Sequence, residues 1–197
     1  MIKTGSEIIG IDEVGRGCLA GPLLVVAARP RRRLPKGLAD SKQLSAKRRC
    51  ELFQELILAC DFGEGWVSVA EINKLGLSEA MRLGVKRGLD NLEASTEDSI
   101  IIDGHINYCP PKYSKVRAVI KADTHISIVS AASIYAKVTR DEYMRKISLD
   151  FPDYGFGEHV GYGTKRHLKA ITDHGVLAEL HRANFAPIKN LITSPIQ

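Results

Sequence analysis

The segment Ile8-Ile9-Gly10-Ile11-Asp12-Glu13-Val14-Gly15-Arg16-Gly17 is the most informative stretch of this 197-residue chain. It begins as an apolar run typical of a strand, then carries two adjacent acids, and ends in a glycine-arginine-glycine turn. Acids are costly in a buried strand unless something compensates them. Because adjacent strand residues point to opposite faces, we expect the strand to end or bulge at Asp12 and Glu13 and to aim both carboxylates at a divalent metal.

Two further acids follow apolar runs: Asp103 ends the run 99–103, and Asp123 follows the run 116–122. Ligand sites of α/β sheets gather at strand ends, so we expect these acids to join Asp12 and Glu13. Four clustered carboxylates repel one another, and bound cations would relieve that repulsion. Oxygen ligands suit Mg²⁺ or Mn²⁺ rather than zinc, and two such ions can promote phosphodiester hydrolysis. The alternative is that Asp103 and Asp123 only cap loops.

The order of the predicted elements favours a mixed α/β sheet with helices on both faces and a small helical C-terminal part. Apolar and turn patterns predict strands over 7–14, 23–29, 66–69, 99–103 and 116–122. Helical spacing predicts helices capped by Ser45 and Ser68, a long helix over 127–148, and a basic one over 164–174. In the first helix, one face is expected to carry Leu52, Phe53, Leu56, Ile57 and Cys60, and the tail 185–197 is expected to be irregular.

Charge favours a polyanionic partner. The net charge is +5, and basic residues crowd the segment from Arg29 to Arg49, a second group from Lys112 to Lys121, and a third from Lys165 to Lys169. Three such groups beside the acidic motifs favour nucleic acid, although each alone could be solvated surface. Ser41-Lys42 could contact a phosphate or form a plain loop. The turn Gly15-Arg16-Gly17 offers amides and a guanidinium that suit a phosphate.

Other classes find little support in the sequence. No run reaches membrane-spanning length, and we expect no signal peptide. The four cysteines have no zinc-like spacing, which favours free thiols in a reduced, cytoplasmic setting. The six histidines fit no zinc signature either, so we expect surface or supporting roles for them.

An ordered set of motifs resembles the ribonuclease HII family over residues 8 to 190. The motifs are Ile11–Gly17, Asp40–Lys42, Ile102–Gly104, Lys121–Asp123, Ser130–Asp141 and Gly161–Thr164. The resemblance implies a ribonuclease H-like catalytic domain over 1–150 and a glycine/aromatic loop with a helical extension over 151–197. It also implies cleavage of the RNA strand of RNA–DNA hybrids, including single ribonucleotides embedded in duplex DNA, with 3′-hydroxyl and 5′-phosphate products and Mg²⁺ or Mn²⁺ as cofactor.

The resemblance assigns roles to individual residues. Asp12, Glu13, Asp103 and Asp123 match the four catalytic, metal-holding carboxylates. Gly15-Arg16-Gly17 resembles the loop that senses the 2′-hydroxyl, the one group that distinguishes a ribonucleotide from a deoxyribonucleotide at a given position. Tyr162 resembles the tyrosine that stacks near the RNA–DNA junction, and Ser41 and Lys42 join the substrate contacts.

Two positions depart from the usual pattern of the family without removing an acid. Ala122 stands where many bacterial members have glycine, and Thr124-His125 replaces a common lysine-serine pattern. We expect a monomer acting on hybrids and on ribonucleotide-containing DNA duplexes. The alternatives are another metal-dependent nuclease of the same superfamily, such as a junction resolvase, and a non-catalytic nucleic-acid-binding module.

Overall fold

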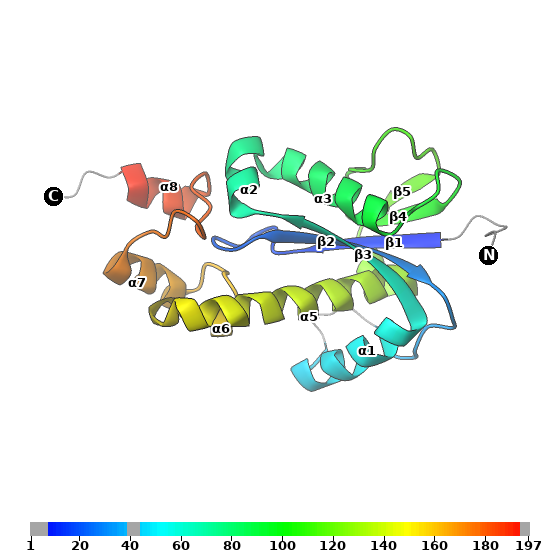
Figure 1. Cartoon of the computed structure of the whole chain (residues 1–197), viewed down its shortest axis with the longest axis horizontal. Helices are drawn as coiled ribbons and strands as arrows, with labels where there is room; N and C mark the ends of the chain where they lie inside the picture. Colours follow the sequence, from blue (N-terminus) through cyan, green and yellow to red (C-terminus); the bar gives the residue numbers. More distant parts are fainter. Residues whose placement is uncertain (1–7, 39–43, 194–197) are drawn as a thin grey trace. The chain divides into compact units, whose positions relative to one another are not determined.

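The computed structural model describes residues 8–38 and 44–193 and contains a five-stranded sheet in the order β3-β2-β1-β4-β5 (Figure 1). The strands are β1 Ile8–Val14, β2 Leu23–Pro30, β3 Cys60–Val67, β4 Ser99–Asp103 and β5 Val116–Val119. The strand β1 pairs with β2 antiparallel and with β4 parallel, and β4 pairs with β5 parallel. The predicted mixed sheet is therefore confirmed.

Helices surround and follow the sheet. They are α1 Ala46–Ala59, α2 Val69–Leu75, α3 Leu77–Asn91, α4 Ala122–His125, α5 Ser127–Asp150, α6 Phe156–His159, α7 Lys165–His174 and α8 Ala186–Thr193, with a 3₁₀ turn over Pro152–Tyr154. Ser45 caps α1 and Ser68 caps α2, as expected, and Ser68 also forms a capping box with Glu71. The predicted long helix is confirmed by α5.

The chain groups into two compact units, each built from separated stretches. Among the described residues, unit 1 comprises 8–14, 24–38, 44–66 and 81–138, and unit 2 comprises 15–23, 67–80 and 139–193. This grouping reflects compactness, so the predicted domain division at residue 150 stays a prediction.

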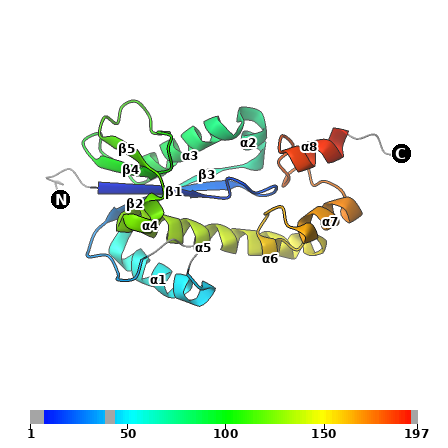
Figure 2. The same cartoon turned by 180° about the vertical axis from the view of Figure 1, so that it is seen from behind.

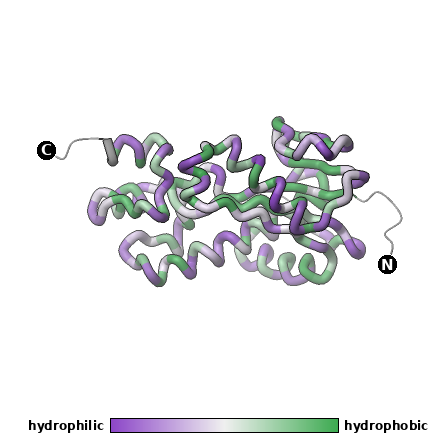
Figure 3. The backbone as a smooth tube through the Cα atoms, turned by 45° about the horizontal axis from the view of Figure 1, so that its top comes forward, coloured by the Kyte–Doolittle hydropathy of each residue, from purple (hydrophilic) through white to green (hydrophobic). Residues whose placement is uncertain are grey.

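In unit 1, the sheet is covered on both faces. Figures 1 and 2 show α3 on one side, with α1 and the start of α5 on the other. Alternate residues of β2, namely Leu24, Val26 and Ala28, pack into the core with α1 and α5. The residues between them, Val25 and Ala27, lie against Gly84 and Gly88 of α3. Figure 3 shows hydrophilic and hydrophobic residues alternating along the coiled, helical stretches of the chain.

Glycines set the distance between α3 and β3. A Cβ on Gly65 would lie 1.9 Å from the Gly84 carbonyl oxygen, and one on Gly63 would lie 2.0 Å from that of Gly88. Only hydrogen fits there, so the helix rests directly on the strand backbone. The helix α3 therefore approaches β3 most closely at Gly84 and Gly88.

Several predicted boundaries are wrong. The strand β3 starts at Cys60 rather than near Trp66, so Cys60 belongs to the sheet and not to α1, and Ile57 of α1 is 39% exposed. The strand β5 ends at Val119 and is only partly buried, because it lies at the sheet edge. The tail contains α8, which tolerates Pro187 because a proline in the first turn lacks only an N–H that has no helical partner.

Unit 2 has a core of its own. Leu19, Ala20, Met144, Phe156 and Ile188 are among its buried residues, so the loop 15–23, the end of α5 and the C-terminal helices pack together. No helix of the described residues is long and apolar enough to cross a membrane. All four cysteines are free thiols, as expected.

Candidate active site

The strand β1 runs through both of its acids without a break. Its ladder pairs Asp12 with Val26 and Glu13 with Val25 in one continuous register that extends to Val14. The predicted strand end or bulge at the acids is therefore wrong. Because side chains alternate along a regular strand, Asp12 and Glu13 leave opposite faces of the sheet.

Asp12 and Asp103 leave the same face, the one that α5 covers. Gly10 lies against the start of α5, where a Cβ would come within 2.6 Å of the Ile128 carbonyl carbon. Gly10 also pairs with Ile101 of β4. Asp12 follows Gly10 by two residues, and Asp103 follows Ile101 by two, so the period of the strand places both carboxylates on the α5 side.

Asp12 is a buried acid in a negative environment. Only 6% of the residue is exposed. Burial raises the pKa of the Asp12 carboxyl well above its ordinary value, and the charges of Glu13 and Asp103 raise it further. A hydrogen bond from Ser133 and the Glu13 N–H, 2.8 Å from Oδ1, act in the opposite direction. A bound cation would remove the repulsion that these three carboxylates exert on one another.

Asp123 lies in a different element than expected. It lies in the first turn of α4 and is buried, beyond the end of β5. The Ala122 N–H donates to Asp103 Oδ1 at 2.7 Å, so the start of α4 is tied to the end of β4. Asp123 therefore directly follows Ala122, the residue that bonds Asp103. The strand β5, which was predicted to run up to Asp123, ends at Val119 instead.

Two serines of α5 support the acids, and the sequence analysis included them only within the motif Ser130–Asp141 without giving either a role. Ser133 bonds the Asp12 carboxylate, and the Ser130 hydroxyl donates to the Asp123 carbonyl oxygen at 2.6 Å. Residues three apart lie on one face of a helix. This spacing of two serines in a helix opposite the acidic strands is the signal that could have identified them.

The donor set suits a hard divalent cation, because all four candidate ligands are carboxylates. Within residues 8–38 and 44–193, however, no three His, Cys, Asp or Glu side chains form a group arranged to hold a metal ion. Asp103 is bonded to the Ala122 N–H, and Asp12 to the Glu13 N–H. Coordination by three or more of the acids would therefore require side-chain rotations, while the elements that carry them are already in place.

The predicted phosphate-binding turn belongs to unit 2. Gly15 has φ +86°, and a Cβ there would lie 2.3 Å from Arg140 Nε, so a side chain is excluded twice. The Cys18 N–H donates to the Gly15 carbonyl at 3.3 Å and closes the turn. Gly17 is exposed, with open space where a Cβ would be. The turn therefore presents its backbone at Gly17.

Two fully buried arginines hold this loop, and the sequence analysis did not single out either. Arg140 donates to the carbonyls of Ala20, Pro22 and Val160 at 3.1, 2.8 and 2.9 Å. Arg182 donates twice to the Gly21 carbonyl and once, at 3.1 Å, to that of Arg16. Burial lowers the pKa of Arg182 to about 10, which leaves it charged at neutral pH.

The same network reaches Tyr162. The Gly161 carbonyl accepts from the N–H groups of Leu19, at 2.8 Å, and Ala20, at 3.2 Å. The Tyr162 residue itself is 36% exposed. Partial burial and the nearby Cys18 raise the pKa of its phenol to about 12, so the hydroxyl stays protonated and can donate. The structure thus brings the Gly15–Gly17 turn and Tyr162 into one hydrogen-bonded framework within unit 2.

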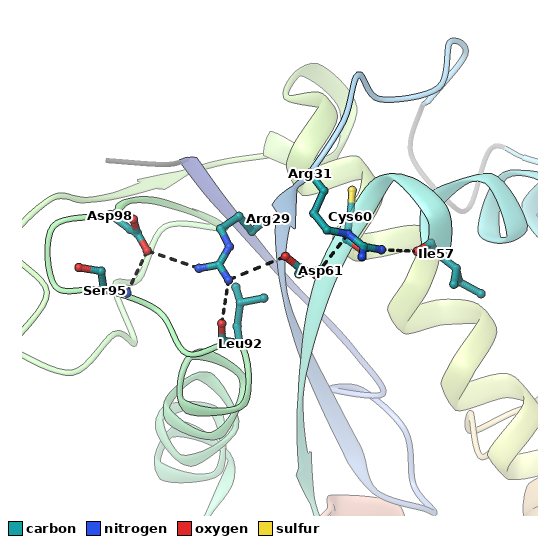
Figure 4. A network of polar contacts seen from close by, with 8 residues as sticks. All are labelled: Arg29, Arg31, Ile57, Cys60, Asp61, Leu92, Ser95 and Asp98. Atoms are coloured by element: carbon teal, nitrogen blue, oxygen red, sulfur yellow. Dashed lines mark hydrogen bonds and ion pairs between the residues drawn. The ribbon is translucent and has the colours of Figure 1, made fainter. Parts of the chain in front are cut away.

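Part of the basic segment is structural. Arg29 is buried, donates to the Leu92 carbonyl at 3.1 Å, and lies 3.9 Å from Asp98 (Figure 4). Arg31 pairs with Asp61 at 3.2 Å. Phosphate contact by Arg29 is therefore wrong, whereas Arg32 and Arg33 are exposed. Ser41 and Lys42, the other predicted substrate contacts, lie outside the described residues.

A mixed sheet in this order, with carboxylates on its central parallel strands, defines a ribonuclease H-like nuclease. The sequence model of ribonuclease HII matches residues 9–188. A ribonuclease HII from Coxiella burnetii (strain Dugway 5J108-111) is 42% identical over 193 residues, covering 96% of this chain and 94% of the relative. The chain belongs to the ribonuclease HII family, whose members cleave RNA in RNA–DNA hybrids.

Solved structures agree with this fold. The ribonuclease HII in the PCNA:RNase HII complex from Archaeoglobus fulgidus has a TM-score of 0.75 and 27% identity, covering 91% of this chain and 95% of that one. Bst-RNase HIII in complex with Mn²⁺ has a TM-score of 0.72 and 23% identity, covering 95% of this chain and 69% of that one. The predicted enzyme class is confirmed over the junction resolvase and the non-catalytic binding module.

Proposed function

We propose that this ribonuclease also cuts at single ribonucleotides embedded in duplex DNA, using divalent cations held by Asp12, Asp103 and Asp123, with Glu13 adding its negative charge from the neighbouring position of the strand. The observation that carries the proposal is the buried Asp12 carboxylate, whose pKa is raised by burial and by two further acids. Such an arrangement is unfavourable alone and becomes favourable around a cation. Bst-RNase HIII with Mn²⁺ supports this metal class by its fold.

Each part of the chain would have a separate task. When bound, Mg²⁺ or Mn²⁺ would activate water and stabilise the leaving oxygen, giving 3′-hydroxyl and 5′-phosphate ends. Asp12 and Asp103 would orient the cations from the sheet, with Asp123 completing the set from α4. Ser130 and Ser133 would hold two of these residues in place from α5.

Recognition of the ribonucleotide would fall to unit 2. The exposed backbone at Gly17 can approach a 2′-hydroxyl closely, because no side chain intervenes. The Arg16 carbonyl is fixed by Arg182, so this turn is preorganised before substrate binds. Tyr162 would pack against a sugar at the junction and donate its protonated hydroxyl to a phosphate. The monomeric state and cytoplasmic location stay predictions.

The test compares end-labelled substrates: a duplex with one ribonucleotide, an all-DNA duplex, a long RNA–DNA hybrid and a four-way junction. Each is incubated with Mg²⁺, with Mn²⁺, and with chelator alone. We expect one cut at the ribonucleotide, cleavage of the hybrid, and no product from the all-DNA duplex, the junction or any chelated reaction. Cleavage of the hybrid without cleavage at the single ribonucleotide would contradict the finer specificity. Cleavage in chelator would contradict the metal mechanism.

A further inference from the structure

Three histidines are buried together in unit 2, so the expected surface role is wrong for them and a supporting role is left. His159 is 8% exposed, His167 0% and His181 1%. The rings of His159 and His167 stack with centroids 4.3 Å apart, and those of His167 and His181 are 5.3 Å apart. Burial lowers the pKa of His167 and of His181 to about 4, so both rings are neutral at physiological pH.

The hydrogen bonds of His167 and His181 determine which nitrogen of each neutral ring carries its proton. The Tyr162 carbonyl, 2.9 Å from His167 Nδ1, can only accept, so Nδ1 carries the proton and Nε2 accepts. His181 Nε2, 3.1 Å from His167 Nε2, must then be the donor. His181 Nδ1 consequently accepts, and the Leu177 N–H donates to it at 2.8 Å. His181 Nδ1 also lies 3.2 Å from the Leu177 carbonyl, but that carbonyl already accepts from the His181 backbone N–H at 2.8 Å, so the Leu177 N–H is the partner of Nδ1 that agrees with this assignment.

This series of hydrogen bonds ends at the peptide group of Tyr162. The Tyr162 carbonyl also accepts from the Thr164 N–H at 2.8 Å, and the Tyr162 N–H donates to the His159 carbonyl at 2.9 Å. The residue before it, Gly161, has φ +89°. Because glycine has no Cβ, it does not by itself fix the orientation of the Tyr162 peptide. The backbone is thus held from both sides while the residue itself remains 36% exposed.

We propose that His167 and His181 are positioning residues for Tyr162, in which a relay from the Leu177 N–H through both imidazoles to the Tyr162 carbonyl fixes the peptide that presents the tyrosine ring. The relay rests on the proposed function of Tyr162 as a substrate contact. Neither histidine is one of the candidate catalytic acids, and neither needs to touch substrate. Their effect on cleavage would pass through Tyr162 alone.

Substitution by Asn or Gln can test the roles of the two imidazole nitrogens separately. The Asn amide nitrogen occupies the position of Nδ1, and that of Gln the position of Nε2. His167→Asn can keep the donor to Tyr162, whereas His167→Gln loses it. For His181 the required donor is Nε2, so His181→Gln can keep the bond to His167, although it loses the acceptor for the Leu177 N–H, whereas His181→Asn loses the bond to His167. We expect kcat/KM on the single-ribonucleotide duplex to fall about 3- to 10-fold in the two breaking variants and to stay near wild type in the two preserving ones.

The opposite order of Asn and Gln at the two positions separates positioning from general instability, because misfolding would not reverse with the position. Each breaking variant is also combined with Tyr162→Ala. A residue that acts only through Tyr162 should have no further effect there. Asn and Gln behaving alike at both positions, or a breaking variant that still lowers kcat/KM in the Tyr162→Ala background, would overturn the relay.

A different result is expected if Tyr162 is not a substrate contact at all. If Tyr162→Ala cleaves the single-ribonucleotide duplex as well as wild type does, Tyr162 is not a substrate contact, and the positioning role is overturned with it. Nitrogen-15 NMR of the imidazoles then locates the failure. A protonated Nδ1 on His167 and a protonated Nε2 on His181 would show that the relay exists and that the assignment of Tyr162 was wrong.

Discussion

At the scale of single residues, Asp103 offers the sharpest test of the acidic group. Asp103→Asn keeps the shape of the side chain and an oxygen for the Ala122 N–H, but it removes a negative charge beside Asp12. We expect kcat to fall about 100- to 1,000-fold, as when one preorganised charge-stabilising group is removed, with hybrid binding nearly unchanged. Single-turnover cleavage and a filter-binding assay measure the two effects. Asp153→Asn, at an exposed position of unit 2, is the matched control.

The acids could be predicted from sequence because each interrupts or ends an apolar run, where a charge needs a reason. The residues that support them could not. Arg140 sits four residues after Ala136 and four before Met144, and all three are fully buried. Its position in the period of α5 belongs to the core, yet an isolated arginine is normally interpreted as solvated. Only the loop carbonyls that it bonds, far away in sequence, show why it is there.

At the scale of elements, the contact between β3 and α3 predicts different effects for two glycines of one interface. Gly65→Ala would place a methyl group 1.9 Å from the Gly84 carbonyl oxygen, and neither backbone can yield easily. We expect it to destabilise the protein by about 2–3 kcal/mol. In Gly88→Ala the nearest atom is 3.2 Å away. The helix gains up to about 1 kcal/mol of propensity there, so a small net effect is expected.

Thermal unfolding of both variants measures this difference. For a chain of this size, 1 kcal/mol corresponds to a change in Tm of about 2–4 °C. Equal Tm values for the two variants would mean that the helix and strand separate easily, against the close packing described above. Cleavage activity at 25 °C serves as the control for folding.

The contact between β3 and α3 also explains why β3 was harder to predict than other elements. The strand β2 and the helix α5 have long, consistent patterns and were located within a few residues. The strand β3 was mostly missed, because its sequence Cys60–Val67 contains two acids and two glycines. Those glycines weaken a strand pattern, but α3 needs them for its close approach. Tertiary packing decided a structure that local propensity did not indicate.

At the scale of the whole molecule, the buried histidines predict a loss of stability in mild acid. In the unfolded chain, His167 and His181 take up protons below pH 6.5, their ordinary pKa. In the folded chain, the pKa of each is about 4, so both stay neutral down to about that pH. The free energy of unfolding should therefore fall between pH 6.5 and 4, by up to about 3 kcal/mol for each histidine. The double variant His167→Asn/His181→Gln removes both titrating groups and can keep the donor to the Tyr162 carbonyl. Urea unfolding at both pH values should show a flatter pH dependence for it, and parallel curves would contradict the prediction.

The net charge of +5 indicated a polyanionic partner, but only the structure separates free cations from those that hold the fold. The last prediction concerns this division. Arg32→Ala/Arg33→Ala removes two exposed charges, and we expect the slope of log K against log salt to decrease by up to about 1.8. The control is Arg31→Ala, because Arg31 bonds Asp61 and the carbonyls of Ile57 and Cys60. It should lower Tm and leave the slope nearly unchanged. An unchanged slope in the double variant, measured by fluorescence anisotropy on an RNA–DNA hybrid, would show that Arg32 and Arg33 are solvated surface and that the phosphate contacts lie elsewhere.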